Sequence, residues 1–169
     1  FHHCPMPEGN RMAIITGPGG PAVGTTDACT RMGLEVPSLS RETKEKIRRV
    51  MPPVGTSAEN PIDISMAAAV NPGIFENVIK VLGQDAEIDM ILVIGNGGEV
   101  FYDSIRKAKK EVDKPLAVSV LMPLEIVLEA CGQLMREGVP VYSDPVRAAN
   151  ALSKMARYVN FRRGVERSW

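Results

Sequence analysis

The chain lacks an excess of charge of either sign. Its 169 residues carry 20 Lys and Arg against 20 Asp and Glu, so the formal net charge at pH 7 is zero. Proteins that bind nucleic acids or anionic membrane surfaces concentrate positive charge on the surface that makes contact. We therefore expect neither a nucleic acid nor a membrane among the partners of this chain.

Long apolar runs and paired cysteines are missing as well. No apolar stretch approaches the ~20 residues of a membrane-spanning helix, and the first residues lack a signal-peptide pattern. Cys4, Cys29 and Cys131 are far apart and form no CxxC pair, which argues against a disulfide framework and a zinc site. His2 and His3 could bind a metal, but in a polar, proline-containing segment they are more often simply solvated. We predict a cytoplasmic protein with no metal site.

The length and the hydrophobic content of 44% suit one globular domain with a single buried core. No internal repeat or low-complexity tract is present. Residues 1–10 contain Pro5 and Pro7 and are typical of a linker that continues from a preceding domain. The predicted organisation is therefore a linker over 1–10, a domain over 11–163 and a tail over 164–169.

Short apolar segments alternate with helix-compatible segments along the rest of the chain. The apolar segments are continuous, which is typical of strands in a parallel sheet that is covered on both faces. The predicted strands are Met12–Thr16, Ile62–Ser65, Met90–Gly95, Leu116–Val120 and Val139–Tyr142, with Leu34–Val36 as a short extra candidate. This pattern predicts an α/β fold with three layers, in which a mainly parallel sheet of about five strands lies between helices.

Helix start signals stand between the predicted strands. Each is a proline at or near the first helical position, preceded in the first two cases by a capping side chain. The signals are Asn71-Pro72, Asp144-Pro145, Gly20-Pro21 and Met122-Pro123. Ser40 is the predicted cap of a charged helix that runs to Val50, and Gly138 is the predicted end of the helix after Pro123.

A glycine-rich loop joins the first predicted strand to a helix-compatible segment, Ala22–Met32. Glycine lets the backbone approach a ligand closely, and the first-turn amides of a helix have no helical partner. These amides also lie at the positive end of the helix dipole. We therefore predict that Gly17, Gly19, Gly20 and Ala22 bind a phosphate or carboxylate group.

Two other interpretations of this loop stay open. A glycine turn between a strand and a helix is also a common tight corner in α/β proteins. Gly17, Gly19 and Ala22 fit the dinucleotide-binding pattern GxGxxA as well. Glu35 follows the first glycine by about 18 residues, near the place of a ribose-binding acid. Pro21 removes one amide donor from the loop.

Two further loops follow predicted strands. In the first, Asp63 stands between two isoleucines, where its carboxylate either caps neighbouring amides or contacts a ligand or partner domain. In the second, Asn96, Gly97 and Gly98 again allow close backbone approach at a helix start. Since the three loops contain no His, Cys or Lys, we predict positioning and charge stabilisation and no catalytic side chain.

Segments along nearly the whole chain resemble the nucleoside-diphosphate-forming acyl-CoA synthetases, the family of the ADP-forming acetyl-CoA synthetase. The segments that carry the resemblance are Gly9–Thr16, Gly19–Pro21, Asp27-Ala28, Leu39-Ser40, Glu42-Thr43, Asn60–Asp63, Ile88–Val93, Gly138–Tyr142, Pro145–Ala148 and Arg157-Tyr158. The resemblance implies one part of such an enzyme, a flavodoxin-like ligase domain related to the C-terminal domain of the succinyl-CoA synthetase β subunit.

In that family, a carboxylic acid, ATP and CoA give acyl-CoA, ADP and phosphate through an acyl phosphate and a phosphohistidine. By resemblance, the amides of Gly19 and Gly20 would hold the phosphoryl group, and the loops 60–63 and 96–98 would border the acyl site. The domain alone would bind no cofactor, whereas the whole enzyme would use ATP, Mg²⁺ and CoA.

The resemblance also implies the partners of the domain. These would be CoA-binding, phosphohistidine and ATP-grasp domains, in the same chain or in another, without which the domain would be inactive. Neither His2 nor His3 lies in the phosphohistidine motif. Copies of the chain could also associate into a homo-oligomer.

Two alternative functions stay open on the sequence. The first is a non-catalytic, regulatory synthetase-like domain, such as the one found in some protein lysine acetyltransferases. The second is an independent nucleotide- or flavin-binding module, which the spacing of Gly17, Gly19 and Ala22 would suit.

Overall fold

A sheet with every neighbouring pair of strands parallel forms the middle layer of the computed structural model, which describes residues 4–17, 19–65, 67, 71 and 73–166. Its five strands have the spatial order β2-β1-β3-β4-β5, which is flavodoxin-like. The strands are β1 (Met12–Thr16), β2 (Ile62–Asp63), β3 (Met90–Gly95), β4 (Leu116–Val120) and β5 (Val141–Tyr142). The predicted parallel α/β fold is confirmed.

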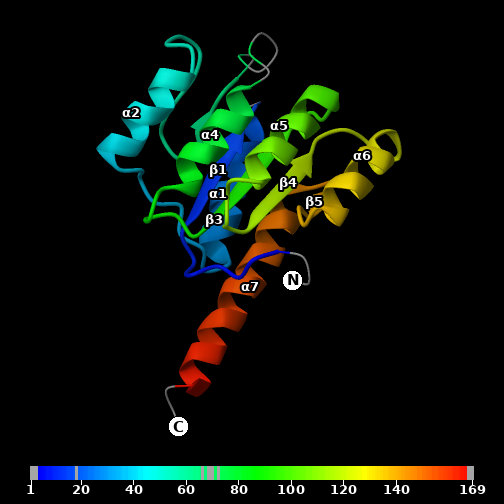
Figure 1. Cartoon of the computed structure of the whole chain (residues 1–169). Coiled ribbons are helices and arrows are strands. Elements are labelled where there is room, and N and C mark those ends of the chain that lie inside the picture. The colour runs from blue at the N-terminus through cyan, green and yellow to red at the C-terminus, as the bar shows by residue number, and fades with distance from the viewer. Residues whose placement is uncertain (1–3, 18, 66, 68–70, 72, 167–169) are drawn as a thin grey trace.

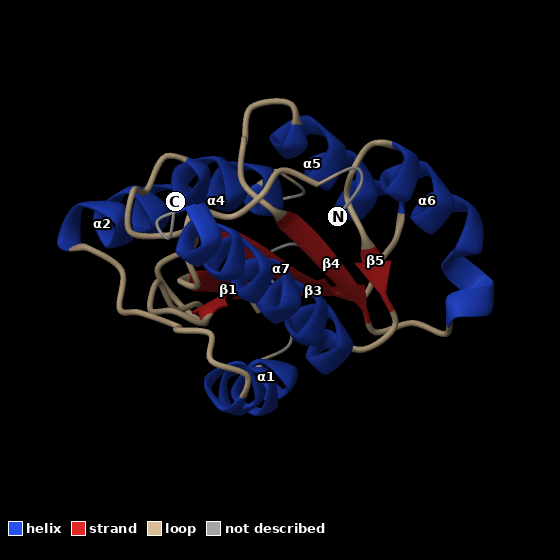
Figure 2. Ribbon diagram, turned by 90° about the horizontal axis from the view of Figure 1, so that it is seen from below, coloured by secondary structure: helices blue, strands red, loops and turns tan. Residues whose placement is uncertain are grey.

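Helices cover both faces of the sheet (Figures 1 and 2). Those in the described residues are α1 (Gly20–Arg31), α2 (Arg41–Val50), α4 (Ile74–Gly83), α5 (Glu99–Lys109), α6 (Leu124–Arg136) and α7 (Pro145–Glu166). Helices α1 and α7 pack together on one face, and α2, α4, α5 and α6 lie on the other (Figure 2). The three layers follow because each helix buries one apolar stripe against the sheet.

The central strands are buried on both faces, which explains their continuous apolar sequences. Ile14 and Leu92 contribute to the core beneath α1 and α7, whereas the next residues along the strands, Ile15 and Val93, contribute to the core on the opposite face. All four side chains are fully buried. Alternation between two cores therefore replaces the alternation between core and solvent that marks a half-exposed sheet.

The edges of the sheet are shorter than predicted. Strand β2 ends at Asp63 and β5 begins at Val141, because each edge strand pairs with only one neighbour over two residues. The extra candidate Leu34–Val36 contributes only an isolated parallel bridge between Glu35 and Arg11. The prediction of a strand there was wrong.

Two of the predicted helix caps are present. The Ser40 hydroxyl accepts a hydrogen bond from the Thr43 amide at 3.0 Å at the start of α2. The Asp144 carboxylate accepts one from the Arg147 amide at 2.9 Å, and α7 begins at the proline that follows. Gly138 follows Glu137, the C-cap of α6, and has a φ of 83°, in the left-handed region. The caps formed by the Ser40 and Asp144 side chains could be predicted because each side chain binds an amide three residues further along the chain.

Other helix starts differ from the predictions. Helix α4 has Gly73 as its N-cap, so Asn71 is not the cap, and Pro72 lies outside the described residues. Helix α6 has Pro123 itself as its N-cap, where it was expected inside the helix. Helix α1 begins at Gly20, two residues before the predicted start.

The first described residues pack along the domain. Pro7 is buried, Cys4 contacts the core beneath α1 and α7, and the Asn10 side chain donates a hydrogen bond to the Gly33 carbonyl at 2.9 Å. At the other end, α7 continues through Glu166, beyond the predicted boundary at residue 163.

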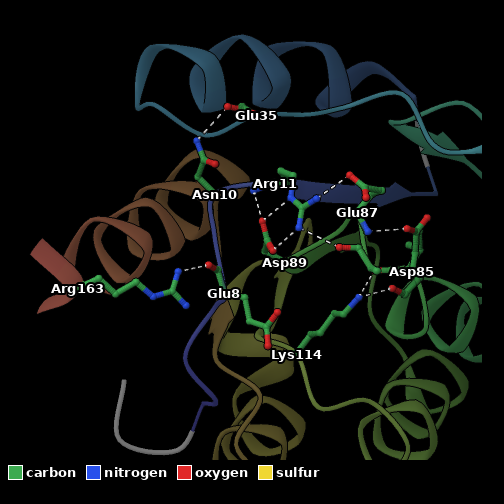
Figure 3. Close-up of polar contacts among 11 residues, drawn as sticks. Glu8, Asn10, Arg11, Glu35, Asp85, Glu87, Asp89, Lys114 and Arg163 are labelled. Carbon is green, nitrogen blue, oxygen red and sulfur yellow. Dashed lines mark hydrogen bonds and ion pairs between the residues drawn. The ribbon is translucent and has the colours of Figure 1, made fainter. Parts of the chain in front are cut away.

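A charged cluster joins the amino ends of β1 and β3 (Figure 3). Arg11 Nε and Nη2 donate to the two carboxylate oxygens of Asp89 at 2.9 Å each, and the Arg11 amide donates to one of them at 2.9 Å. Burial opposes the charge of Asp89, but the hydrogen bonds from Arg11 outweigh it and hold the pKa of Asp89 below its usual value. Glu87, which is mostly exposed, binds the same arginine at 2.7 Å. The cluster thus fixes the end of the sheet at which β1 and β3 begin.

We predict that Asp89→Asn lowers the free energy of unfolding at pH 7 by about 2–4 kcal/mol, because it breaks a buried charged pair. The lowered pKa stabilises the fold above the unfolded-state value of about 4, and this contribution disappears as pH falls through the folded-state value. Urea unfolding from pH 7 to pH 2.5 should therefore show a weaker acid dependence for the variant. Glu87→Gln, at the exposed partner, should change stability by less than about 1 kcal/mol. Equal losses in both variants would contradict the prediction.

Candidate functional site

The carboxyl ends of β1 and β3 lie side by side at the centre of the sheet. Thr16 pairs with Ile94, and the Gly17 amide donates to the Ile94 carbonyl at 3.0 Å, which extends the pairing by one residue. The chain leaves β1 toward α1 on one face and leaves β3 toward α5 on the other (Figure 2). In open α/β sheets, ligands bind in the crevice at such a switch point.

The first glycine loop offers fewer free amides than its sequence suggests. The Gly17 amide is used in the sheet, the Ala22 amide donates to the Gly19 carbonyl at 3.2 Å, and Pro21 has no N–H. Within the described residues, the amides of Gly19 and Gly20 donate no hydrogen bond. Gly19 is the N-cap of α1 and supplies no capping side chain. Of the predicted phosphate-binding residues, these two therefore keep amides available to a ligand.

Asp63 fixes the neighbouring loop against Gly19. Its Oδ1 accepts a hydrogen bond from the Ser65 amide at 2.8 Å, which is the capping role left open by the sequence. Its Oδ2 lies 2.7 Å from the position that a Cβ on Gly19 would occupy. A side chain at Gly19 would therefore force this carboxylate to shift, so glycine allows the two loops to pack this closely.

Asn60 is part of the sheet edge. Its Nδ2 donates to the carbonyls of Met12 at 2.9 Å and Pro37 at 3.0 Å, and its Oδ1 accepts from the Ile14 amide at 3.0 Å. The side chain thus continues the edge of β1 where β2 is too short to pair with it. Because both Nδ2 hydrogens and one lone pair of Oδ1 are used in this way, Asn60 positions the 60–63 loop.

The second glycine loop leads into α5. Gly97 and Gly98 have φ values of 80° and 101°, in the left-handed region that favours glycine, and α5 starts at Glu99 without a side-chain cap. Asn96 is exposed, and its side chain makes no hydrogen bond within the part of the chain that the structure describes. Because β3 pairs with β1, this loop leaves the sheet at the same end as the Gly19 loop.

Tyr102, in the first turn of α5, was missed by the sequence analysis. The side chain is 3% exposed, and its hydroxyl lies 2.6 Å from the position of a Cβ on Gly97. Burial raises the pKa of the Tyr102 phenol, and the neighbouring Cys131 thiol raises it further. In the sequence, Tyr102 could have been noticed as an aromatic residue one helical turn after the Gly97-Gly98 pair.

The acids at the site are Asp63 and Glu99. Glu99 is largely exposed and pairs with Arg106 at 3.4 Å. Among the described residues, no three His, Cys, Asp or Glu side chains are grouped so that they could hold a metal ion. The site can therefore bind a group through backbone amides, but its loops carry no side chain suited to proton transfer at neutral pH.

The dinucleotide interpretation fits this geometry poorly. The Met12 amide donates to the Glu35 carbonyl at 2.7 Å, which places Glu35 at the amino end of β1. The glycine loop follows the opposite end of that strand, about 16 Å away at the usual rise per residue. Glu35 therefore cannot contact a ribose held at the loop.

The fold and the two glycine loops define a flavodoxin-like α/β domain in which two glycine-rich helix starts follow neighbouring strands at the switch point. Residues 12–165 match the model of the Ligase-CoA domain, and the chain belongs to this family. The predicted family is thereby confirmed. In the described residues, no helix is both long and apolar enough to cross a membrane.

The similar proteins are ADP-forming CoA ligases. The chain is 32% identical to the alpha subunit of Pyrococcus furiosus acetate–CoA ligase (ADP-forming) II, over 92% of this chain and 36% of that subunit. It is 29% identical to the 4-hydroxybutyrate–CoA ligase (ADP-forming) of Nitrosopumilus maritimus, over 94% of this chain and 23% of that protein.

A solved structure of acetyl-coenzyme A synthetase 1 from Candidatus Korarchaeum cryptofilum, in complex with phosphate and ADP, superposes with a TM-score of 0.83 at 28% identity. The match covers 98% of this chain and 36% of that one. The chain thus spans between 23% and 36% of the length of these relatives.

We predict that Gly19→Ala lowers the free energy of unfolding by about 1–2 kcal/mol, because its Cβ would displace the Asp63 carboxylate from the Ser65 amide. Gly20→Ala is the matched control, since nothing lies within 4 Å of the Cβ position there. It should leave stability unchanged or raise it slightly, because alanine favours a helix. Thermal unfolding of both variants distinguishes the two sites, and equal melting temperatures would contradict the close packing.

Proposed function

We propose that the chain is the ligase domain of an ADP-forming acyl-CoA synthetase. The whole enzyme would convert a carboxylic acid, ATP and CoA to acyl-CoA, ADP and phosphate through an acyl phosphate and a phosphohistidine. In this reaction, the Gly19 and Gly20 amides at the start of α1 hold the phosphoryl group. The loop of Asn96, Gly97 and Gly98 borders the acyl group.

The observation that carries this proposal is the pair of amides at Gly19 and Gly20, which have no partner in the described residues. They lie at the positive end of a 12-residue helix, where an anion is stabilised by the helix dipole and by direct N–H donation. The relative from Candidatus Korarchaeum cryptofilum, solved with phosphate and ADP, supports an anion as the ligand.

Side chains of this domain position its loops. Asp63 caps the Ser65 amide beside Gly19, and Asn60 ties the same loop to β1. Gly17 and Ala22 contribute to the shape of the α1 loop, since their amides are used within the protein. The domain would thus bind and orient the acyl phosphate while the CoA-binding, phosphohistidine and ATP-grasp domains supply the reacting groups. ATP, Mg²⁺ and CoA belong to those other domains, and this domain alone would be inactive.

A chimera tests the proposal. The chain would replace the matching segment of the Pyrococcus furiosus alpha subunit, and ADP release would be measured with acetate, ATP and CoA. Gly20→Asp places a negative charge at the α1 amides, which suits the helix dipole and so preserves the fold, but repels a phosphoryl group. We expect ADP release to fall by about a hundredfold, comparable to the loss of a donor to a developing anion.

Gly24→Asp is the control, because Gly24 lies one turn further along α1 with nothing within 4 Å of its Cβ position. It should keep ADP release within about twofold of the unmodified chimera, since the dipole effect is confined to the first turn. Full activity in the Gly20→Asp chimera would argue against the anion site. A folded chimera that forms no acyl-CoA would argue against the synthetase role and favour the regulatory alternative.

A further inference from the structure

Helix α6 carries apolar side chains on a face that the rest of the domain does not cover. The helix lies beside β5, the last strand of the sheet, at one end of the molecule (Figure 2). Cys131 and Leu134 of α6 are buried and contribute to the core. Leu128 and Met135, by contrast, are 57% and 48% exposed. Within the described residues, α6 therefore packs with one face only and leaves a second apolar face in solvent.

The exposed apolar residues of α6 form a single stripe. Gly132 follows Leu128 by four residues, and Met135 follows it by seven, so that all three lie on one face of the helix. The glycine leaves a low point between the two long side chains. Since the distance between packed helices depends on the side chains at their contact, another helix can approach closely at this point.

Two charged residues flank this stripe on the same side. Glu129 and Arg136 are exposed, and each directly follows one of the two apolar residues. Arg136 Nη1 lies 3.6 Å from the position of a Cβ on Gly132, so its guanidinium borders the stripe. The two charges are seven residues apart, about 10 Å along the helix, which is too far for direct pairing. Neither forms an ion pair with another described residue.

The stripe is complementary to itself. When a second α6 lies antiparallel, with the two copies of Gly132 opposite each other, Leu128 of each copy meets Met135 of the other. The same register places Glu129 of each copy beside Arg136 of the other. A two-fold axis through the contact generates each of these pairs twice, as in an isologous interface. The apolar side chains and the charges are thus satisfied by one arrangement.

We propose that α6 is a dimerisation surface and that its partner is α6 of a second copy of this chain. The charges favour a second copy, because the stripe carries one acid and one base at nearly equal distances from Gly132. A partner with charge of one sign would pair with only one of them. The contact is small, so it should give a weak dimer with a Kd on the order of 100 µM. The inference does not rest on the proposed function, since no residue of the glycine loops takes part.

Sedimentation equilibrium of the 169-residue chain tests the proposal. Over concentrations from about 10 µM to about 1 mM, the average mass should rise from one chain toward two, without larger species. Leu128→Ser should raise Kd about tenfold or more, because each dimer loses two buried leucine side chains. Val54→Ser is the matched control. Val54 is 85% exposed in the loop between α2 and β2, the strand at the opposite edge of the sheet. Its variant should keep Kd within about twofold.

Charge reversal tests the register of the two helices. Glu129→Arg and Arg136→Glu each create two like-charged contacts in a homodimer and should weaken dimerisation about tenfold. In an equimolar mixture of the two variants, the heterodimer has one native contact and one contact with both charges exchanged. The mixture should therefore dimerise about as tightly as the unmodified chain. Because both residues are exposed, the melting temperature of each variant should stay close to that of the unmodified chain.

Three results would overturn the proposal. A chain that stays monomeric at the highest concentration would leave the α6 face to another domain of the synthetase. Equal dissociation constants for Leu128→Ser and Val54→Ser would place the contact elsewhere, as would a mixture of the charge variants that fails to recover. Assembly beyond two copies would exclude a two-fold contact, which closes with the second copy. None of these results bears on the anion site, which is tested by ADP release.

Discussion

The parallel pairing of β1 with β3 determines where everything else in this domain can lie. It runs in register from Met12 beside Met90 to Thr16 beside Ile94, and the hydrogen bond from the Gly17 amide extends it into the loop. At β4, the Leu121 amide extends the next pairing in the same way by donating to the Gly95 carbonyl at 2.9 Å. Because the strands are parallel, their outgoing loops leave the same end of the sheet, and α1 and α5 begin there on opposite faces (Figure 2).

The two ends of the sheet use polar groups in different ways. At the amino end, polar and charged side chains pair with one another: Arg11 binds Asp89, and the Thr43 hydroxyl donates to Asp85 at 2.6 Å. Lys114 adds a bond to the Leu82 carbonyl at 3.1 Å, and burial lowers the pKa of Lys114. At the carboxyl end, by contrast, the amides of Gly19 and Gly20 have no partner among the described residues. Side-chain interactions therefore hold the sheet together at the end opposite the proposed anion site.

Local signals made the fold largely predictable from the sequence. The strands β1, β3 and β4 have the predicted bounds because a strand buried on both faces needs an unbroken apolar run. Ser40 and Asp144 could be identified as caps because each binds an amide three residues ahead. The predicted lengths of the edge strands β2 and β5 were too long, since the length of an edge strand depends on its pairing partner and not on its own composition.

The site was harder to predict because its contacts are distant in sequence. Asn60 binds backbone groups that lie 23 to 48 residues away, so its use at the sheet edge could not be inferred from its neighbours. The partner of the Gly17 amide is likewise a carbonyl of another strand. Tyr102 looks like any apolar helix residue in the sequence, and only the fold brings its hydroxyl under Gly97.

The amide of Asn60 also bears on the chemical durability of the domain. Its nitrogen faces two carbonyls, so conversion to aspartate would set a carboxylate oxygen against them and remove two bonds from the sheet edge. Asparagine deamidates spontaneously through a cyclic imide. This imide forms when the backbone nitrogen of the next residue attacks the side-chain carbonyl carbon and loses its proton. That nitrogen here belongs to Pro61, which has no proton to lose. The order Asn-Pro thus protects the amide that the sheet edge needs from spontaneous deamidation.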